Sequence, residues 1–157
     1  MRTWFSLCVA FGALALVSGL GMAQDAPLTI SDVKVELKTN TIGKDKGKQY
    51  LRVSFMATAN AKIEPKMVIR ITGAGQFGAE SKSDEIMALG PKLETFEAGV
   101  KSKEITAPLF MKEGIAAAPD RLDLKFTLAK TLEKQGAAVG EFCWTAAGVA
   151  PGACKAG

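Results

Sequence analysis

Apolar and polar residues alternate with a period of two along most of the chain after residue 24, and no other feature constrains the fold as strongly. Val33, Val35 and Leu37 are each followed by a charged residue, and the same period recurs over 50–59 and 122–128. Successive side chains of a β-strand point to opposite faces, so this period indicates strands with one buried face. The pattern therefore predicts a β-rich domain.

Turn-forming residues separate the alternating stretches. Glycine, proline or clustered charge interrupts the chain at 40–48, near Pro65, at Pro119-Asp120 and at 133–136. Residues 73–78 are glycine-rich, and we expect a flexible loop there, whereas 83–89 fit either one helical turn or a short edge strand. About seven strands are predicted, spanning 28–37, 50–59, 67–72, 93–98, 102–109, 122–128 and 139–145.

Short strands without a long helix favour an all-β, antiparallel β-sandwich of residues 24–145, with immunoglobulin-like topology as the best match. The Cys–Trp–Cys spacing of true immunoglobulin domains is missing, because Cys143 and Cys154 both lie near the C-terminus and Trp144 adjoins one of them. The prediction therefore concerns the architecture and no particular family. Residues 146–157 read as an Ala/Gly-rich tail.

The first 23 residues have the pattern of a secretory signal peptide, for which we expect a helix. Arg2 is the only charge in the first 24 residues, an uncharged apolar run covers 4–17, and small residues stand at Gly21 and Ala23. The run is shorter than the roughly 20 residues that span a bilayer. We therefore expect cleavage near Ala23 and release into the periplasm or outside the cell, without stable membrane insertion, in preference to a retained anchor.

Two of the three cysteines, Cys143 and Cys154, remain after such processing, whereas Cys8 lies in the apolar run. An even pair in an oxidising compartment is expected to form a disulfide. The sequence predicts that this bridge holds the tail against the last strand.

The chain contains no histidine. This absence removes histidine-based acid–base catalysis, Ser-His-Asp and Cys-His nucleophiles, and every histidine-ligated metal site. The catalytic options that remain are a carboxylate pair, a Ser-Lys pair or a lysine-based site. Glu94 and Glu97 are an example of a carboxylate pair, but nothing in the sequence places the two across a cleft. We predict no catalytic residue, no metal site and no cofactor. A carboxylate-based enzyme or enzyme inhibitor, and a small-ligand carrier, are the alternatives.

Two motifs resemble ligand sites in part, one in its spacing and the other in its residue types. Gly73, Gly75 and Gly78 have the G-x-G-x-x-G spacing of dinucleotide sites, but no predicted helix or βαβ unit follows them. Asp84-Glu85, Asp120 and Asp123 could bind calcium, but a dedicated site needs six or more oxygen ligands and the EF-hand spacing is absent. Neither motif is predicted to bind.

A group of lysines is the candidate binding feature. Without residues 1–23 the side-chain charge is +3, and lysines outnumber arginines by 16 to 3, which argues against nucleic-acid recognition. The lysines can contact an anionic partner such as an acidic glycan, lipopolysaccharide or lipid headgroups, or can simply keep a turn soluble and protect a sheet edge. The members of the group are Lys34, Lys38, Lys44, Lys46 and Lys48.

Export, β-sandwich patterning and the lack of catalytic motifs together favour a non-catalytic exported domain. We expect it to bind or assemble with a protein or glycan of the cell envelope or the extracellular space.

The signal-peptide prediction is tested by N-terminal sequencing of the protein recovered from exporting cells. We expect the chain to start at Gln24, because cleavage follows the small residue Ala23. A recovered chain that still starts at Met1 contradicts cleavage.

Overall fold

The computed structural model of the chain describes residues 26–64, 66–88, 96–111, 114–131, 133 and 135–155. Within these residues the protein is all-β, and no helix is present. The strands are β1 (Leu28–Thr39), β2 (Gln49–Ala59), β3 (Met67–Phe77), β4 (Glu80–Ala88), β5 (Ile105–Leu109), β6 (Arg121–Lys130), β7 (Ala137–Thr145) and β8 (Gly148–Pro151).

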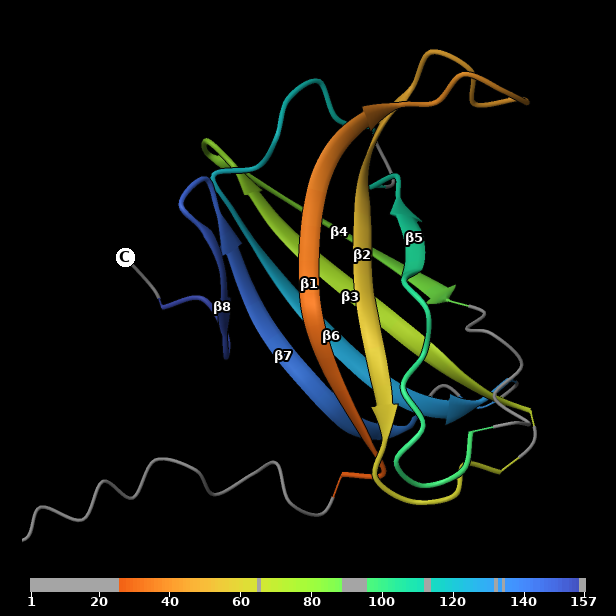
Figure 1. Cartoon of the computed structure of the whole chain (residues 1–157). Helices are drawn as coiled ribbons and strands as arrows, with labels where there is room; N and C mark the ends of the chain where they lie inside the picture. The colour runs from red at the N-terminus through yellow and green to blue at the C-terminus, as the bar shows by residue number, and fades with distance from the viewer. Residues whose placement is uncertain are drawn as a thin grey trace, which may run out of the picture.

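The strands form two antiparallel sheets, one of three strands in the order β1-β2-β5 and one of five in the order β4-β3-β6-β7-β8. Figure 1 shows the two sheets face to face, with β1 and β2 crossing in front of β3, β6 and β7. The arrangement is that of a β-sandwich. Over the described residues no helix is long and apolar enough to cross a membrane, and the predicted signal-peptide helix at 1–23 lies outside them.

The core lies between the sheets and is built from the alternating residues that the sequence pattern identified. Phe55 of β2 and Phe126 of β6 meet at its centre with ring centroids 5.0 Å apart, and Phe142 of β7 contacts Phe126 edge-on. Burying such side chains contributes about 1.5–3 kcal/mol each. Fully buried partners from both sheets surround them: Leu28, Leu51, Val53, Ile69, Ile71, Leu109, Leu122 and Leu124.

A β-bulge in β1 changes which residues face the core. The pairing with β2 shifts between Ser31 and Lys34, and Asp32 has a positive φ of 54°. An extra residue in a strand reverses the inward and outward positions that follow it. Leu28 and Ile30 therefore face inward before the bulge, and Val35 and its alternating neighbours pack on the core after it.

Six of the seven predicted strands are present, and the differences lie in the segments with the weakest alternation. The prediction of a flexible loop at 73–78 is wrong, because β3 continues through Phe77 and pairs with both β4 and β6. The segment 83–89 falls within the edge strand β4 as far as Ala88. Of the predicted strand 93–98, residues 93–95 lie outside the described residues and 96–98 are irregular.

β3 contains two glycines at positions with little space for a side chain. A Cβ atom on Gly73 would lie 2.7 Å from Cδ1 of Leu109, and one on Gly75 would lie 2.8 Å from the ring of Phe77. Glycine weakens a strand in isolation, but at Gly73 it leaves room for Leu109 of the opposite sheet, and at Gly75 for the ring of Phe77 in the same strand. The glycines thus serve packing.

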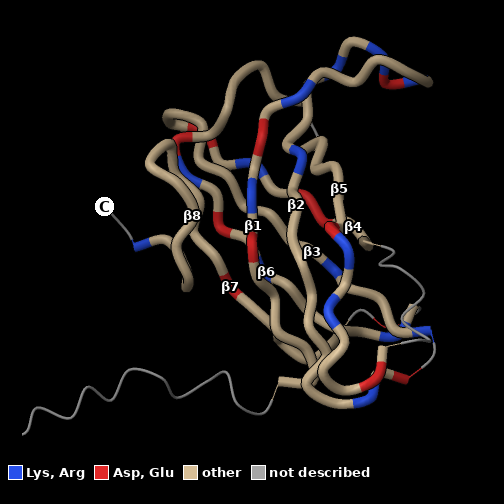
Figure 2. Tube along the Cα trace, viewed as in Figure 1, with Lys and Arg blue, Asp and Glu red and all other residues tan. Residues whose placement is uncertain are grey.

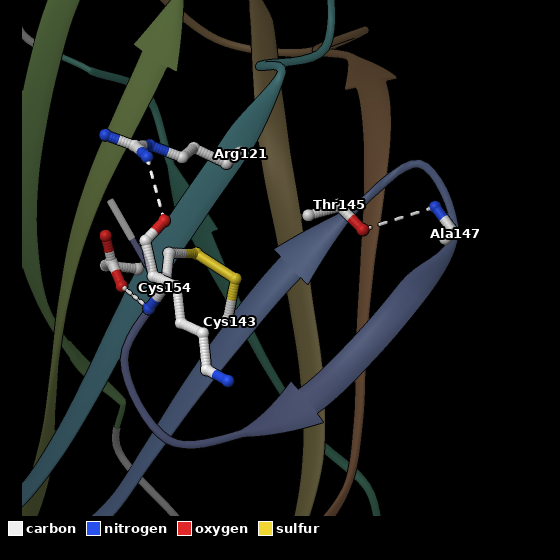
Figure 3. Close-up of a disulfide and its surroundings, with 7 residues drawn as sticks. Arg121, Cys143, Thr145, Ala147 and Cys154 are labelled. Carbon is white, nitrogen blue, oxygen red and sulfur yellow. Dashed lines mark hydrogen bonds between the residues drawn. A yellow bond between two sulfur atoms is a disulfide. The ribbon is translucent and has the colours of Figure 1, made fainter. Parts of the chain in front are cut away.

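The C-terminal tail contains an eighth strand that the sequence did not predict. β8 pairs with β7, and the disulfide between Cys143 and Cys154 ties the following segment back across the sheet (Figure 3). The amide of Cys154 donates to the Asp123 carboxylate, and Arg121 donates to the carbonyl of Lys155. The predicted disulfide is therefore present, and β6 side chains reinforce it.

Replacing both bridged cysteines by serine should lower the free energy of unfolding by about 3 kcal/mol, because the bridge closes a loop of 11-residue separation. Chemical denaturation measures the change, and the reduced wild-type protein is the control that should match the variant. Equal denaturation midpoints for variant and oxidised wild type would rule out the stabilising role.

Candidate functional site

The β1–β2 hairpin carries all five predicted lysines, and its turn projects beyond the sandwich (Figure 1). Its turn, residues 40–48, is closed by backbone hydrogen bonds from Asn40 to Lys48 and from Gly47 to Asn40. Gly43 and Gly47 have φ angles of 72° and 87°, which glycine adopts without strain. The turn is therefore an organised element that presents its side chains in a defined way.

The structure divides the five predicted lysines into two sets. Three of them lie beside carboxylates: Lys34 is 4.0 Å from Glu104, Lys38 is 3.2 Å from Glu36, and Lys48 is 2.7 Å from Asp45. The other two, Lys44 and Lys46, form no ion pair with any described residue. Lys34 is also remote from the turn, since it pairs with Ser54 partway along β2. The predicted patch is therefore reduced to the tip of the hairpin.

The charge of the tip is set by three lysines and one aspartate. The hydrogen bond from Lys48 lowers the pKa of Asp45 below its usual value, and the nearby charges of Lys48 and Lys44 lower it further. Asp45 is therefore ionised at neutral pH, and residues 40–48 carry a net charge of +2. Figure 2 shows the basic residues that flank this turn.

Sequence reasoning missed one residue of this tip. Ile42 has 77% of its surface exposed, the highest value among the large exposed hydrophobic residues of the described chain. Its amide lies 3.4 Å from Oδ1 of Asn40, while its side chain packs on nothing in the core. The available signal was a β-branched residue within a turn otherwise made of polar and glycine residues, since such residues favour strands.

The sheet face below the hairpin carries charges of both signs. On the outer side of the three-stranded sheet, Glu104 lies within 4.0 Å of Lys34 and 3.9 Å of Arg52. Tyr50 and Phe110 pack together nearby with ring centroids 5.1 Å apart. Mixed charges of this kind leave little field for an anionic partner.

The aspartates considered as calcium ligands each support the backbone at a separate place. Both Phe110 and Met111 donate their amides to Oδ2 of Asp84, which joins β4 to the end of β5. Asp120 accepts from the amide of Gly78, and Asp123 accepts from the tail. No group of three acidic or cysteine side chains in the described residues has the geometry to hold a metal ion.

The other candidate motifs are dispersed. Gly73 and Gly75 lie inside β3, so the segment that fits G-x-G-x-x-G is a strand and its following turn. Glu97 is exposed and lies 3.1 Å from Lys62, and its proposed partner Glu94 lies outside the described residues.

A hollow of about 320 Å³ lies at the end of the sandwich opposite the hairpin. Ile63 and Leu128 form part of its apolar floor, and exposed charged residues such as Lys62 and Glu133 form its rim. Its volume is at the lower limit of about 300–1,000 Å³ for small-molecule sites, which usually include a few converging polar groups.

The sheet edges carry features that oppose the addition of another strand. β1 has its bulge at Asp32, the short β5 contains Pro108, and the four-residue β8 ends at Pro151. On β4, Lys82 and Asp84 alternate with the outward residues and point toward the sandwich interior. Bulges, prolines, short strands and inward charges all discourage edge-to-edge pairing. Loops are therefore the surfaces most available for contact.

Comparisons with protein-family models, curated proteins and solved structures found no match to the chain. Function is therefore inferred from the chain's own residues.

Asp84 provides a test of this structural account. The free energy of unfolding of the Asp84→Ala variant should be about 2–4 kcal/mol lower than that of wild type. The reason is that the backbone amides of Glu85, Phe110 and Met111 lose their hydrogen-bond acceptor. Chemical denaturation measures the loss, and Asp84→Asn, which keeps one acceptor oxygen, should lose less.

Ser83→Ala on the same strand is the matched control and should stay close to wild type. Equal stability of Asp84→Ala and Ser83→Ala would contradict the bridging role of Asp84. A rise in wild-type melting temperature on adding calcium, lost in Asp84→Ala, would instead support the calcium interpretation.

Proposed function

We propose that the protein is an exported, non-catalytic immunoglobulin-like domain that binds an anionic component of the cell envelope or extracellular space through its β1–β2 hairpin. Export rests on the charged, apolar and small-residue order of residues 1–23. The Cys143–Cys154 disulfide is compatible with a periplasmic or extracellular location, because such bridges persist in oxidising compartments.

The strand order supports the immunoglobulin-like assignment. The first, second and fifth strands share one sheet, while the third, sixth and seventh share the other. This grouping matches the immunoglobulin sandwich, in which strands A, B and E belong to one sheet and strands C, F and G to the other. β4 pairs with β3 in the position of the strand that variable-type domains add to the CFG sheet. β8 is an addition to that plan.

The observation that carries the binding proposal is the charge left over at the hairpin tip. Elsewhere on the three-stranded sheet lysines and arginines face carboxylates at 4.0 Å or less, as Lys34 and Arg52 face Glu104. Lys44 and Lys46 have no such partner among the described residues, on a turn that projects from the body of the domain. Unpaired charge on a protruding element is free to attract an anionic partner.

The test is retention on a heparin column at low salt. Replacing Lys44 and Lys46 by glutamine should weaken binding roughly 10- to 30-fold, because each contact between a lysine and an anion contributes about 1 kcal/mol in water. Binding should also fall as salt rises from about 0.01 M to about 0.15 M, because the Debye length shortens from about 30 Å to about 8 Å.

The matched control is the double variant Lys125→Gln with Lys130→Gln, which removes the same charge from β6 on the other sheet. It should be retained nearly as well as wild type. Equal loss in both double variants would mean that net charge alone causes retention, and no retention of wild type at low salt would end the proposal.

A further inference from the structure

The hairpin tip combines two kinds of side chain that a single-charge site does not need. Lys44 and Lys46 provide positive charge, and Ile42, two residues before the first of them, leaves 77% of its surface in water. Isolated exposed hydrophobic residues are common on protein surfaces and need no special explanation. The position of this one, on the projecting element that also carries the unpaired lysines, is what requires an account.

Folding does not account for Ile42. The turn is closed by backbone hydrogen bonds that any residue can make, including Lys46 N to Gly43 O and Lys48 N to Asp45 O. Ile42 belongs neither to the core cluster nor to the partly buried residues that pack against it. A polar residue at this position would satisfy the turn equally well and would be better solvated.

An exposed isoleucine beside two lysines suits some classes of anionic partner better than others. A polysaccharide offers sulfate, carboxylate and hydroxyl groups, which the lysines can bind but which give an isoleucine nothing apolar to enter. A bilayer surface offers both: phosphate-bearing headgroups for the lysines and, just beneath them, acyl chains for the isoleucine.

We propose that the tip of the β1–β2 hairpin docks on an anionic lipid surface, with Ile42 entering the headgroup boundary and Lys44 and Lys46 contacting lipid phosphates. The proposal rests on the proposed binding function and names its partner. Such a contact is peripheral and reversible. One apolar side chain and two charges support only a dissociation constant of about 1 mM, expressed as the concentration of accessible lipid.

The long β1 strand makes the orientation of such a contact measurable. Leu28 and Thr39 begin and end the strand, so the tip lies roughly 35–40 Å from the other end of the sandwich at about 3.3 Å per residue. Lys62 lies at that other end, where Asn60 contacts Pro27. A bilayer that covers the tip therefore leaves Lys62 in water.

The first test is cosedimentation of the full chain with vesicles of phosphatidylcholine containing phosphatidylglycerol, at low salt. Phosphatidylcholine alone sets the baseline, including any binding by the apolar run at 4–17. Ile42→Ser should bind the anionic vesicles about 10-fold more weakly, and the Lys44→Gln/Lys46→Gln variant about 25-fold more weakly, at about fivefold for each charge. Asp45→Asn should bind about fivefold more tightly, because it removes the one negative charge of the tip.

Heparin retention separates this proposal from the broader one. Ile42→Ser should be retained on heparin like wild type, since heparin offers no apolar phase. If Ile42→Ser and wild type bind anionic vesicles equally, the lipid proposal is overturned, while a lysine-dependent heparin retention keeps the proposed function. If wild type binds neither heparin nor anionic vesicles above baseline, both proposals are wrong.

Acetylation of lysines, read by mass spectrometry with and without anionic vesicles, maps the contact independently of affinity. Lys44 and Lys46 should be protected several-fold, while Lys62 and Lys125 should react as in solution. Protection of Lys62 without protection of Lys44 and Lys46 would place the opposite end of the sandwich on the bilayer and contradict the proposal.

Discussion

The contact between Phe55 and Phe126 joins the two sheets, and the rest of the structure depends on it. Both rings are completely buried, one on β2 and one on β6, and their edge-on packing fixes which face of each sheet is internal. Once Phe55 faces inward, the strict alternation of β2 sends Arg52 and Ser54 to the opposite face. β1 and β2 stay paired in antiparallel register as far as Thr39 and Gln49, so the turn at 40–48 lies outside the core.

Several polar side chains stabilise this frame. Asp84 holds β4 to the end of β5, Asp120 holds the β3–β4 turn, and Asp123 holds the tail beside the disulfide. Lys82 extends over the ring of Phe77 and donates to the carbonyl of Gly114. Asp84, Asp120 and Asp123, which could be taken for ligands in the sequence, are therefore engaged in the folded chain, whereas the hairpin tip presents charge and apolar surface together.

The sequence predicted the fold class and most strands because alternation reports directly which face of a strand is buried. The prediction failed where the conformation of a segment depends on residues that are distant in the sequence. Nothing near Gly73 indicates that Leu109 occupies the space of its missing side chain, so β3 was predicted to end early. The four-residue β8 has too little alternation to stand out, and only its pairing with β7 makes it a strand. The lysine group was visible in the sequence, but only the register and the positions of Glu104 and Glu36 separate Lys34 and Lys38 from the tip.

We propose that residues 40–48 form the contact surface of this domain and that they contact anionic lipid. The most direct measurement is a residue-resolved NMR titration of backbone amides with bicelles that contain phosphatidylglycerol. We expect shifts and line broadening confined to the turn between Thr39 and Gln49 and centred on Ile42. These changes should be absent with bicelles of phosphatidylcholine alone. Perturbations centred on the five-stranded sheet or on the opposite end near Lys62, or none at all, would contradict the proposal.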